Sequence, residues 1–417
     1  MKKQLLSSSL ILVMGTGVAQ VLPILALPLL AQYYEPESFN FLALFISASA
    51  ILSILSTGRY ELAILKPKYD KTAFSLFSLS VCISLLFALL VWIIILILYF
   101  SDLSVIYQNR FTPISLLLLP LGIMNYGLIQ VISYWFSRKD KFKLTSYLKV
   151  AQSVVVVSLS LILGILGFKL NGLVIAFASG GLFVVICVLF ILYKRRGLID
   201  RKLIKKVALR NINFPKYLMF SALLDTFATQ APVIFLSAHF SPFQVGSYSF
   251  ASRIVTAPVS LLGGSIAQAF LQTFSRLLHE GKQVYVFFIK TVLILAALAL
   301  CILGLVFMLA PTLFDLFFDP QWELAGKLAS FLALALIPRF IVAPVSASMI
   351  ALESMKMLTF WQILYTVTTA TFFYVFSQMP LLEVVSFYYI HEFILYALYF
   401  IFIRNAIRKH HFKQPNL

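Results

Sequence analysis

The sequence predicts an all-α integral membrane protein with 12 transmembrane helices, arranged as two six-helix bundles around a central cavity and with both termini cytoplasmic. Of the 417 residues, 61% are hydrophobic and 12% are charged, whereas a soluble domain has about half apolar and a quarter charged residues. The apolar residues form long runs, and basic residues gather in every second connection between the runs. This composition excludes a cytosolic enzyme, a secreted disulfide-rich domain and a nucleic-acid-binding domain.

Each apolar run is long enough to cross a membrane, which takes about 20 residues. The first run follows Met-Lys-Lys, but it has no convincing cleavage site and leads directly into a second run, so we expect it to be retained and not removed as a signal peptide. The twelve predicted spans are residues 5–31, 39–57, 74–100, 111–136, 144–167, 172–193, 217–238, 245–271, 285–310, 328–351, 357–378 and 382–403.

The net charge of +18 is distributed unevenly along the chain. The two termini and every second connection hold 26 of the 33 Lys and Arg residues with six acids, and the opposite connections hold three basic residues with seven acids. Basic residues accumulate in cytoplasmic loops, so this alternation places both termini in the cytoplasm and requires an even number of spans.

The longest connection, residues 194–216, separates six spans from six and contains nine basic residues. It predicts an N-terminal bundle (1–193), a basic cytoplasmic linker (194–216) and a C-terminal bundle (217–417). We interpret the linker as a topology determinant that also lies against anionic lipid headgroups. Because six is even, both halves enter the membrane in the same direction, as parallel repeats do in several transporters.

Polar residues recur at helical spacing within several spans, and two interpretations stay open. Small and hydroxyl side chains allow close helix packing, whereas several such stripes together indicate a common polar cavity. The stripes are Ser249, Arg253, Thr256 and Ser260; Ser221, Asp225 and Thr229, with Gln230; Ser49, Ser53 and Ser56; Tyr126, Gln130 and Ser133; and Gln362, Thr366 and Thr369.

Four charged residues lie deep within spans, where a charge costs at least about 2.5 kcal/mol. Arg253 and Arg339 suit an anionic headgroup, because a guanidinium stays protonated and binds phosphate oxygens in a bidentate manner. Asp225 and Glu392 are candidates for binding a coupling proton or sodium ion. An internal ion pair of Asp225 with Arg253 is the structural alternative. Lys149 lies closer to a span end, where snorkelling explains it.

No enzymatic or metal-binding motif is present in the sequence. It lacks a Walker A loop, a dinucleotide-binding glycine pattern, HExxH and CxxC, and its five histidines have no metal-ligand spacing. Cys82, Cys187 and Cys301 lie in apolar runs and are expected to act as small hydrophobes. We therefore expect no enzyme activity, catalytic residue, metal or cofactor, and no ATP-driven transport by this chain alone.

Several segments resemble the Wzx-type oligosaccharide-lipid flippases, a family of bacterial polysaccharide biosynthesis proteins. In the first half these are Gly15-Thr-Gly-Val-Ala-Gln20, residues 34–39 and Thr57-Gly-Arg-Tyr-Glu-Leu-Ala-Ile64. In the second half, Gly246-Ser-Tyr-Ser-Phe-Ala-Ser-Arg253 is similar to the family's Gly-x-Tyr-x-x-Ala-x-Arg segment, and Lys149-Val-Ala-Gln152-Ser153 resembles its fifth span. The chain departs from the family where Asp225 is not followed closely by an arginine.

The resemblance implies membership of the multidrug/oligosaccharidyl-lipid/polysaccharide exporter (MOP) superfamily and alternating access by two six-helix bundles. It also implies flipping of an undecaprenyl-pyrophosphate-linked oligosaccharide across the bacterial inner membrane for O-antigen, capsule or a related polymer. Membrane lipids, a polysaccharide polymerase and chain-length proteins are expected partners, and nucleic acid is not. The substrate or cavity candidates are Arg253, Arg339, Lys149, Gln20, Gln152, Thr256, Ser260 and Gln230, and the ion-coupling candidates are Asp225 and Glu392.

Two alternatives stay open at the level of the sequence. A drug or cation exporter of the same superfamily would be expected to have an acidic cavity, whereas two arginines balance the two deep acids here. A membrane polysaccharide polymerase would be expected to carry a large periplasmic loop, whereas the longest outer connection has about 17 residues, at 311–327.

Overall fold

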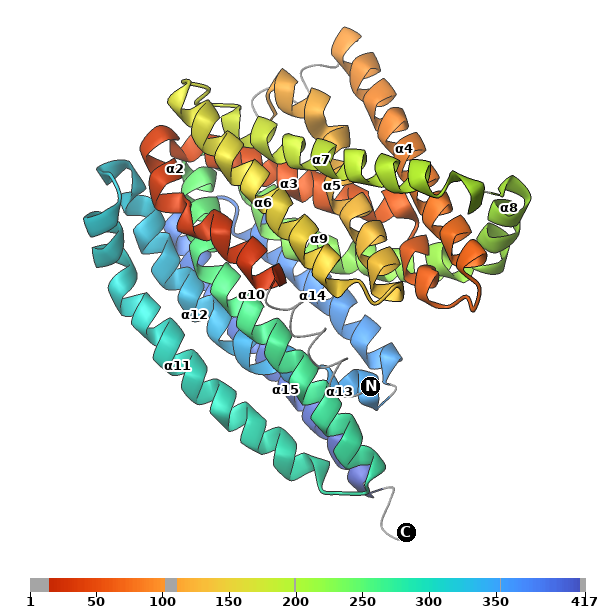
Figure 1. The fold of residues 1–417 in the computed structure, drawn as a ribbon. Helices are drawn as coiled ribbons and strands as arrows, with labels where there is room; N and C mark the ends of the chain where they lie inside the picture. Colours follow the sequence, from red (N-terminus) through yellow and green to blue (C-terminus); the bar gives the residue numbers. More distant parts are fainter. Residues whose placement is uncertain (1–14, 102–110, 199, 353, 413–417) are drawn as a thin grey trace. The chain divides into compact units, whose positions relative to one another are not determined.

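The computed structural model describes residues 15–101, 111–198, 200–352 and 354–412, and every regular element within these residues is helical (Figure 1). Eleven described helical stretches are long and apolar enough to cross a membrane. The remaining predicted span, 357–378, corresponds to α14 (Met355–Val375), which has 21 residues and is made less apolar by Gln362 and five threonines. The prediction of an all-α membrane protein with twelve membrane helices is confirmed, although the start of the span at 5–31 lies outside the described residues.

The chain divides into two compact units, residues 1–237 and 238–417. In the first unit, α5 is the central helix and packs against α3, α4, α6 and α7. The helices of this unit, after the span Gly15–Tyr33 that includes α2 (Leu27–Tyr33), are α3 (Pro36–Thr57), α4 (Asp70–Phe100), α5 (Pro113–Arg138), α6 (Phe142–Ile165), α7 (Gly172–Lys194), α8 (Arg201–Arg210) and α9 (Met219–His239), with short helical turns η1 (Tyr60–Leu65), η3 (Arg196–Leu198) and η4 (Phe214–Leu218).

Glycines allow α3 and α5 to approach closely. A Cβ atom built on Gly122 would lie 2.3 Å from the Ser49 Oγ, and one on Gly127 would lie 2.7 Å from the Ser56 Oγ. Small residues of this kind bring helix backbones together in membranes, where lipid supplies no hydrophobic drive for association.

In the second unit, α12 is the central helix and packs against α10, α11 and α15. At one end of this unit, the ring of Phe250 lies 4.0 Å from that of Trp322 and 6.1 Å from that of Phe314. The helices are α10 (Pro242–His279), α11 (Val284–Phe317), α12 (Glu323–Val345), α13 (Ser348–Ala351), α14 and α15 (Leu381–Phe412), with the turn η5 (Pro320–Trp322).

Corresponding spans of the two halves start in the same way. Pro36 is the first residue of α3 and Pro242 is the first residue of α10. A proline at this position loses no helical hydrogen bond, and its fixed φ suits the first turn. The Ser241 side chain accepts from the Gln244 backbone N–H, and the Gln244 side chain accepts from the Ser241 N–H, which completes a capping box.

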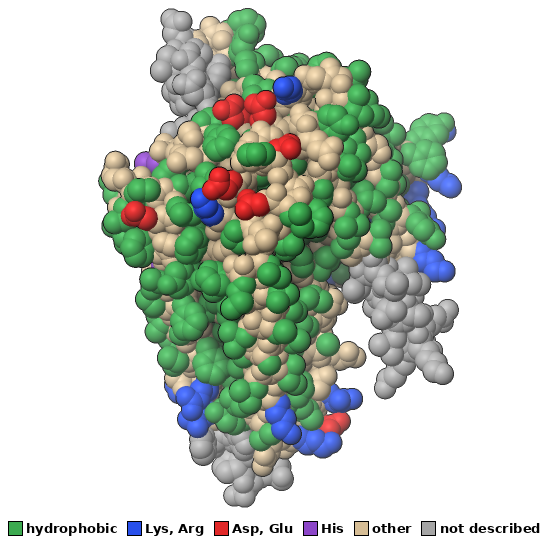
Figure 2. Space-filling view, turned by 90° about the vertical axis from the view of Figure 1, so that its left-hand side faces the viewer, with side chains coloured by type: hydrophobic (Ala, Val, Ile, Leu, Met, Phe, Trp, Pro, Cys, Tyr) green, Lys and Arg blue, Asp and Glu red, His purple; other side chains and the backbone are tan. Residues whose placement is uncertain are grey.

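Large apolar side chains cover the outer surface of many helices (Figure 2). Leu86, Met308 and Leu316, for example, are 61%, 74% and 73% exposed. A water-soluble monomer rarely exposes so much contiguous apolar area, so lipid is the natural environment of these faces. The three cysteines are free, and Cys82 and Cys301 are among the exposed side chains.

Candidate functional site

A buried carboxylate lies near the middle of α15. Glu392 is 2% exposed, and its Oε1 atom accepts a hydrogen bond of 2.8 Å from the hydroxyl of Tyr365 on α14. The Tyr365 hydroxyl also lies 3.4 Å from the hydroxyl of Tyr388, one turn before Glu392. Because burial of an unpaired charge costs several kcal/mol, these hydroxyls help to hold the carboxylate in place.

Arg339 of α12 supplies the positive charge beside this carboxylate. Its guanidinium interacts electrostatically with Glu392 and with the hydroxyl of Tyr396. Tyr248 of α10 is 4% exposed and interacts with both charges. The structure therefore brings together two residues, Arg339 and Glu392, to which the sequence assigned separate roles. We call the following residues the Arg339–Glu392 cluster: Tyr248, Arg339, Tyr365, Tyr388, Glu392 and Tyr396.

Aromatic rings pack along one side of this cluster. Trp361 stacks on Tyr399 with ring centroids 4.1 Å apart and an interplanar angle of 2°, and Tyr396 lies edge-on to Trp361 at 5.8 Å. All three side chains are buried. Such ring pairs add about 0.5 to 1.5 kcal/mol each beyond their buried area, so they fix α14 against α15 around the charged groups.

His391 packs against aromatic rings of α14 and α15. Its ring centroid lies 5.1 Å from that of Phe372 and 5.7 Å from that of Tyr388. The Nδ1 atom is 3.8 Å from the Glu392 carboxylate, which is longer than a hydrogen bond.

A second polar network connects four helices of the first unit. Lys149 of α6 donates to the Thr16 hydroxyl over 3.4 Å, and Gln152, one turn later, donates to the side-chain oxygen of Asn125 on α5. The Asn125 amide in turn donates to the Phe177 carbonyl of α7 over 3.4 Å. Lys149 and Gln152 are half-buried and Asn125 is buried, so this network carries a positive charge into the helix bundle.

Three further candidates of the first unit differ in their surroundings. Gln230 of α9 accepts a 2.9 Å hydrogen bond from the Ser47 hydroxyl of α3, so it links two helices. Gln20 is exposed. Asp225 is also exposed and lies on α9, and its pairing with Arg253 stays a prediction.

Two hydroxyl groups of the polar stripe on α10 donate to backbone carbonyls of the same helix. Arg253 is half-buried. The Thr256 hydroxyl donates to the Ser252 carbonyl over 2.6 Å, and the exposed Ser260 hydroxyl donates to the Ala257 carbonyl over 2.9 Å. Both hydroxyl oxygens keep lone pairs with which they can accept a hydrogen bond.

The serine stripe of α3 serves helix packing. Ser49, Ser53 and Ser56 are 0%, 7% and 0% exposed, and the first and last face the close approach of Gly122 and Gly127. Of the two interpretations that the sequence left open, packing therefore applies to this span.

A buried acid also lies outside the spans, in η1. Glu61 is 1% exposed, and one carboxylate oxygen lies 3.5 Å from the Arg59 guanidinium. Gly58 and Arg59 both have a left-handed backbone, with φ of 57° and 59°, which reverses the chain after α3. Burial raises the pKa of the Glu61 carboxyl, and Thr57 and Arg59 partly offset this rise.

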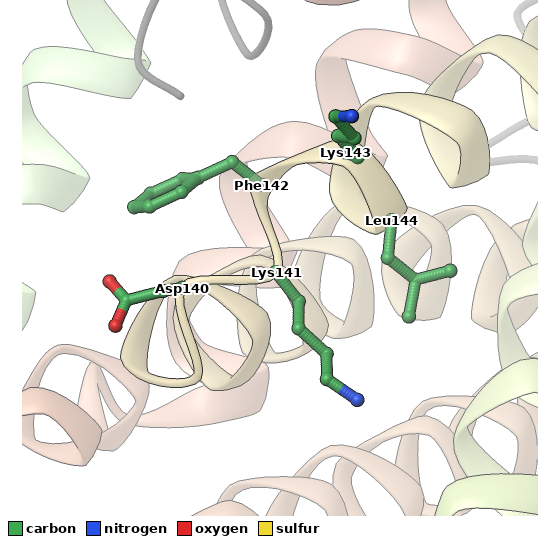
Figure 3. Close-up of a pocket in the computed structure, with 5 residues that line it drawn as sticks. All are labelled: Asp140, Lys141, Phe142, Lys143 and Leu144. Atoms are coloured by element: carbon green, nitrogen blue, oxygen red, sulfur yellow. The ribbon is translucent and has the colours of Figure 1, made fainter. Parts of the chain in front are cut away.

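A shallow hollow of about 290 Å³ lies over the connection between α5 and α6. Figure 3 shows that its lining comes from this one turn, with the side chains of Asp140 and Lys141 pointing in different directions. It contains none of the predicted site residues. Among the residues that the structure describes, no group of three or more His, Cys, Asp or Glu side chains is placed to hold a metal ion. The lining residues of the hollow are Asp140, Lys141, Phe142, Lys143 and Leu144.

A family described as "Polysaccharide biosynthesis protein" matches residues 29–326, well over half of the chain. The chain belongs to this family. The match includes η1 and all of α10, which overlap two of the segments on which the sequence resemblance rests. No curated protein matches this member of the polysaccharide biosynthesis protein family.

Solved transporters share the fold of this polysaccharide biosynthesis protein. An inward-facing multidrug resistance MATE family transporter of the MOP superfamily has a TM-score of 0.70 and 16% identity, with 95% of this chain and 96% of that chain covered. An outward-facing structure described in the same way has a TM-score of 0.60, 17% identity and 98% and 96% coverage. A MOP superfamily transporter from Pyrococcus furiosus has a TM-score of 0.59, 15% identity and 98% and 96% coverage. The protein therefore has the fold of MOP superfamily transporters, with many helices long and apolar enough to cross a membrane.

Sequence reasoning missed the tyrosines around Glu392. Their signal is present in the sequence, since Tyr388, Glu392, Tyr396 and Tyr399 follow one another at spacings of four, four and three and so share one face of α15. Asn125 was missed as well. The residues three and four positions before and after it on α5 are not polar, so it belongs to no polar stripe.

Proposed function

We propose that this protein is a flippase, which moves an undecaprenyl-pyrophosphate-linked oligosaccharide repeat unit across the bacterial cytoplasmic membrane by alternating access. Its product would enter the assembly of O-antigen, capsule or a related polysaccharide. The observation that carries the proposal is the family match over residues 29–326 in a chain with the MOP transporter fold. The basic connections orient both termini toward the cytoplasm under this proposal.

The pyrophosphate group is assigned to cationic side chains within the spans. Lys149 of the first unit donates to a threonine hydroxyl, which is neutral and does not offset the charge of the ammonium. Arg253 is half-buried on α10 of the second unit. An ammonium and a guanidinium both bind phosphate oxygens through charge-assisted hydrogen bonds. Gln20, Gln152, Gln230, Thr256 and Ser260 are proposed to contact sugar hydroxyls.

Glu392 is assigned to the coupling ion, with a proton favoured over sodium. The carboxylate is surrounded by the Tyr365 hydroxyl, which donates to it, and by the Arg339 guanidinium, whose charge repels a metal cation. Protonation of Glu392 removes the negative charge that balances Arg339. It thereby changes by one unit the charge that Arg339 and Glu392 together present to an anionic substrate, which links proton binding to substrate binding. Asp225 remains the second candidate.

The proposed activity involves no covalent chemistry and needs no enzyme site or cofactor. Only binding and a change in access are required of the side chains named above. A polymerase that joins repeat units, and proteins that set chain length, would act on the product at the outer face.

The deciding experiment locates lipid-linked repeat units in a strain that lacks this protein. Accumulation of complete units on the cytoplasmic face, reversed by the wild-type protein, is expected for the flippase. Accumulation on the outer face would instead indicate a polymerase, and normal polysaccharide with increased drug sensitivity would indicate an exporter. Arg253→Ala and Lys149→Ala are expected to insert normally and to fail in this complementation. Full complementation by both variants would contradict the assignment of the pyrophosphate.

A further inference from the structure

The short helix α8 is fixed to the first unit at the end where three spans meet. It follows α7 and precedes η4 and α9. At its start, the Asp200 carboxylate accepts hydrogen bonds from the backbone N–H groups of Lys202 and Leu203 over 3.1 and 3.2 Å. The same carboxylate lies 3.0 Å from the Nζ atom of Lys71, in the first turn of α4. The N-cap and the ion pair hold α8 against the end of α4.

One face of α8 is buried against η1 and its neighbours. Val207 is 3% exposed, and Leu203 packs against the core that contains it. The Tyr60 hydroxyl donates to the Ala208 carbonyl over 3.2 Å. Just after α8, Phe214 is 8% exposed and has the Lys66 ammonium 4.4 Å from its ring centroid. The helix therefore has a fixed orientation, and its opposite face is fixed with it.

The opposite face combines basic and apolar side chains. Leu209 and Ile212 are 66% and 50% exposed, although burial of a leucine or isoleucine side chain is favourable by about 1.5 to 3 kcal/mol. No Asp or Glu occurs between Arg201 and Leu218. We call this face the α8 surface and define it by its exposed residues Lys202, Lys205, Lys206, Leu209, Arg210 and Ile212.

Exposed tyrosines lie at the ends of spans that flank the α8 surface in the chain or contact α8. Tyr69 precedes α4, Tyr193 is the penultimate residue of α7, and Tyr217 lies in η4; they are 71%, 69% and 60% exposed. Arg196 lies over the ring of Tyr193 and Lys216 over that of Tyr217, at 5.2 and 5.3 Å. Tyrosine is enriched where helices leave the bilayer, so all three mark the same boundary.

We propose that the α8 surface binds the anionic headgroups of phospholipids in the cytoplasmic leaflet. Its lysines and arginine meet the phosphates, while Leu209 and Ile212 enter the boundary between headgroups and acyl chains, as in other interfacial amphipathic helices. The positive charge of the α8 surface is complementary to an anionic leaflet and not to a neutral one. The inference rests on the orientation in the proposed function, but not on the substrate.

A fluorescence experiment on the full chain tests this binding. Cys82, Cys187 and Cys301 are replaced by alanine, and an environment-sensitive fluorophore is attached to Ile212→Cys. The protein is reconstituted in phosphatidylcholine vesicles with and without phosphatidylglycerol. We expect the anionic lipid to shift the emission to the blue and to reduce quenching by acrylamide, and high salt to weaken both effects. A fluorophore on Leu166→Cys, 65% exposed at the far end of α6, is expected to show neither effect.

Two triple variants separate the α8 surface from general surface charge. Lys202→Gln/Lys205→Gln/Lys206→Gln is expected to abolish the response to phosphatidylglycerol. Lys68→Gln/Lys141→Gln/Lys143→Gln removes three exposed lysines from the same end of the first unit and is expected to retain the response. Identical emission in the two lipids, or equal loss in both variants, would overturn the proposal. Since no transport is measured, either result leaves the flippase assignment to be decided by its own experiment.

Discussion

The Tyr365 hydroxyl donates a 2.8 Å hydrogen bond to the Glu392 carboxylate, and this bond joins α14 to α15 near the middle of both helices. Both partners are buried. A hydrogen bond to a charged group contributes more than a neutral one, and its loss leaves the acceptor desolvated without compensation. The pair is therefore a sensitive point for both stability and ion binding.

Tyr365→Phe removes this bond and keeps the ring that packs on Trp361. We expect the free energy of unfolding to fall by about 1 to 3 kcal/mol, measured by denaturant unfolding in detergent. Tyr374→Phe is the matched control, because Tyr374 lies on the same helix and is 72% exposed; it is expected to change little. In a Glu392→Gln background, Tyr365→Phe should lower the free energy of unfolding by less than it does in the wild type. Strictly additive effects of the two substitutions would argue against direct coupling of the two side chains.

Arg339→Met is expected to destabilise the second unit strongly. The substitution removes the guanidinium whose charge acts on the buried Glu392, and a buried charge that loses its opposite charge is destabilising. Arg339→Met/Glu392→Gln removes both charges and should recover the thermal stability. Under the proposed function it should not recover transport. A single variant as stable as the wild type would show that Arg339 does not compensate Glu392.

The spans could be predicted from sequence because lipid imposes a simple requirement. Each crossing must satisfy its own backbone hydrogen bonds and present apolar side chains over about 30 Å. These constraints act locally along the chain, so a reader of the sequence sees them directly. Pro36 and Pro242 could be placed near span starts for the same reason, because proline chemistry is local.

Partnerships between helices could be predicted only in part. Arg339 and Glu392 could be recognised from the sequence as charges that are costly to bury within spans. They are 53 positions apart, however, and no local sequence pattern indicates that they lie close together. The serines of α3 had the same pattern as a cavity lining, and only the glycines of α5, which are remote in sequence, distinguish packing from a cavity. What the sequence lacks is the identity of each helix's neighbour.

Gly127→Ala is expected to destabilise the contact between α3 and α5. The added Cβ would lie 2.7 Å from the Ser56 Oγ and 3.2 Å from the Thr57 methyl group, and overpacking of this kind costs about 1 to 3 kcal/mol. Gly304→Ala in α11 is the control, because no atom lies within 4 Å of its added Cβ; it should be neutral or slightly stabilising. Ser56→Ala should partly rescue Gly127→Ala in thermal unfolding. An unaffected Gly127→Ala would contradict the close approach.

Glu61 is expected to make stability depend on pH, in a direction that is unusual for an acid. Burial raises the pKa of its carboxyl, although Arg59 partly offsets this rise. Between the unfolded pKa of about 4.3 and the higher pKa of the folded state, the native protein binds more protons than the unfolded chain. The free energy of unfolding therefore rises as pH falls through this window, and the gain is lost as pH rises above the folded pKa.

Glu61→Gln should remove this dependence, so that the melting temperatures of the variant and the wild type converge or cross as the pH is lowered from neutral. Glu280→Gln is the matched control. Glu280 is exposed, and its hydrogen bond with Lys282 lowers the pKa of its carboxyl, so it titrates below the window and its loss should leave the pH slope within the window unchanged. Equal slopes for the wild type and Glu61→Gln would show that the Arg59 guanidinium fully compensates the buried carboxylate at neutral pH.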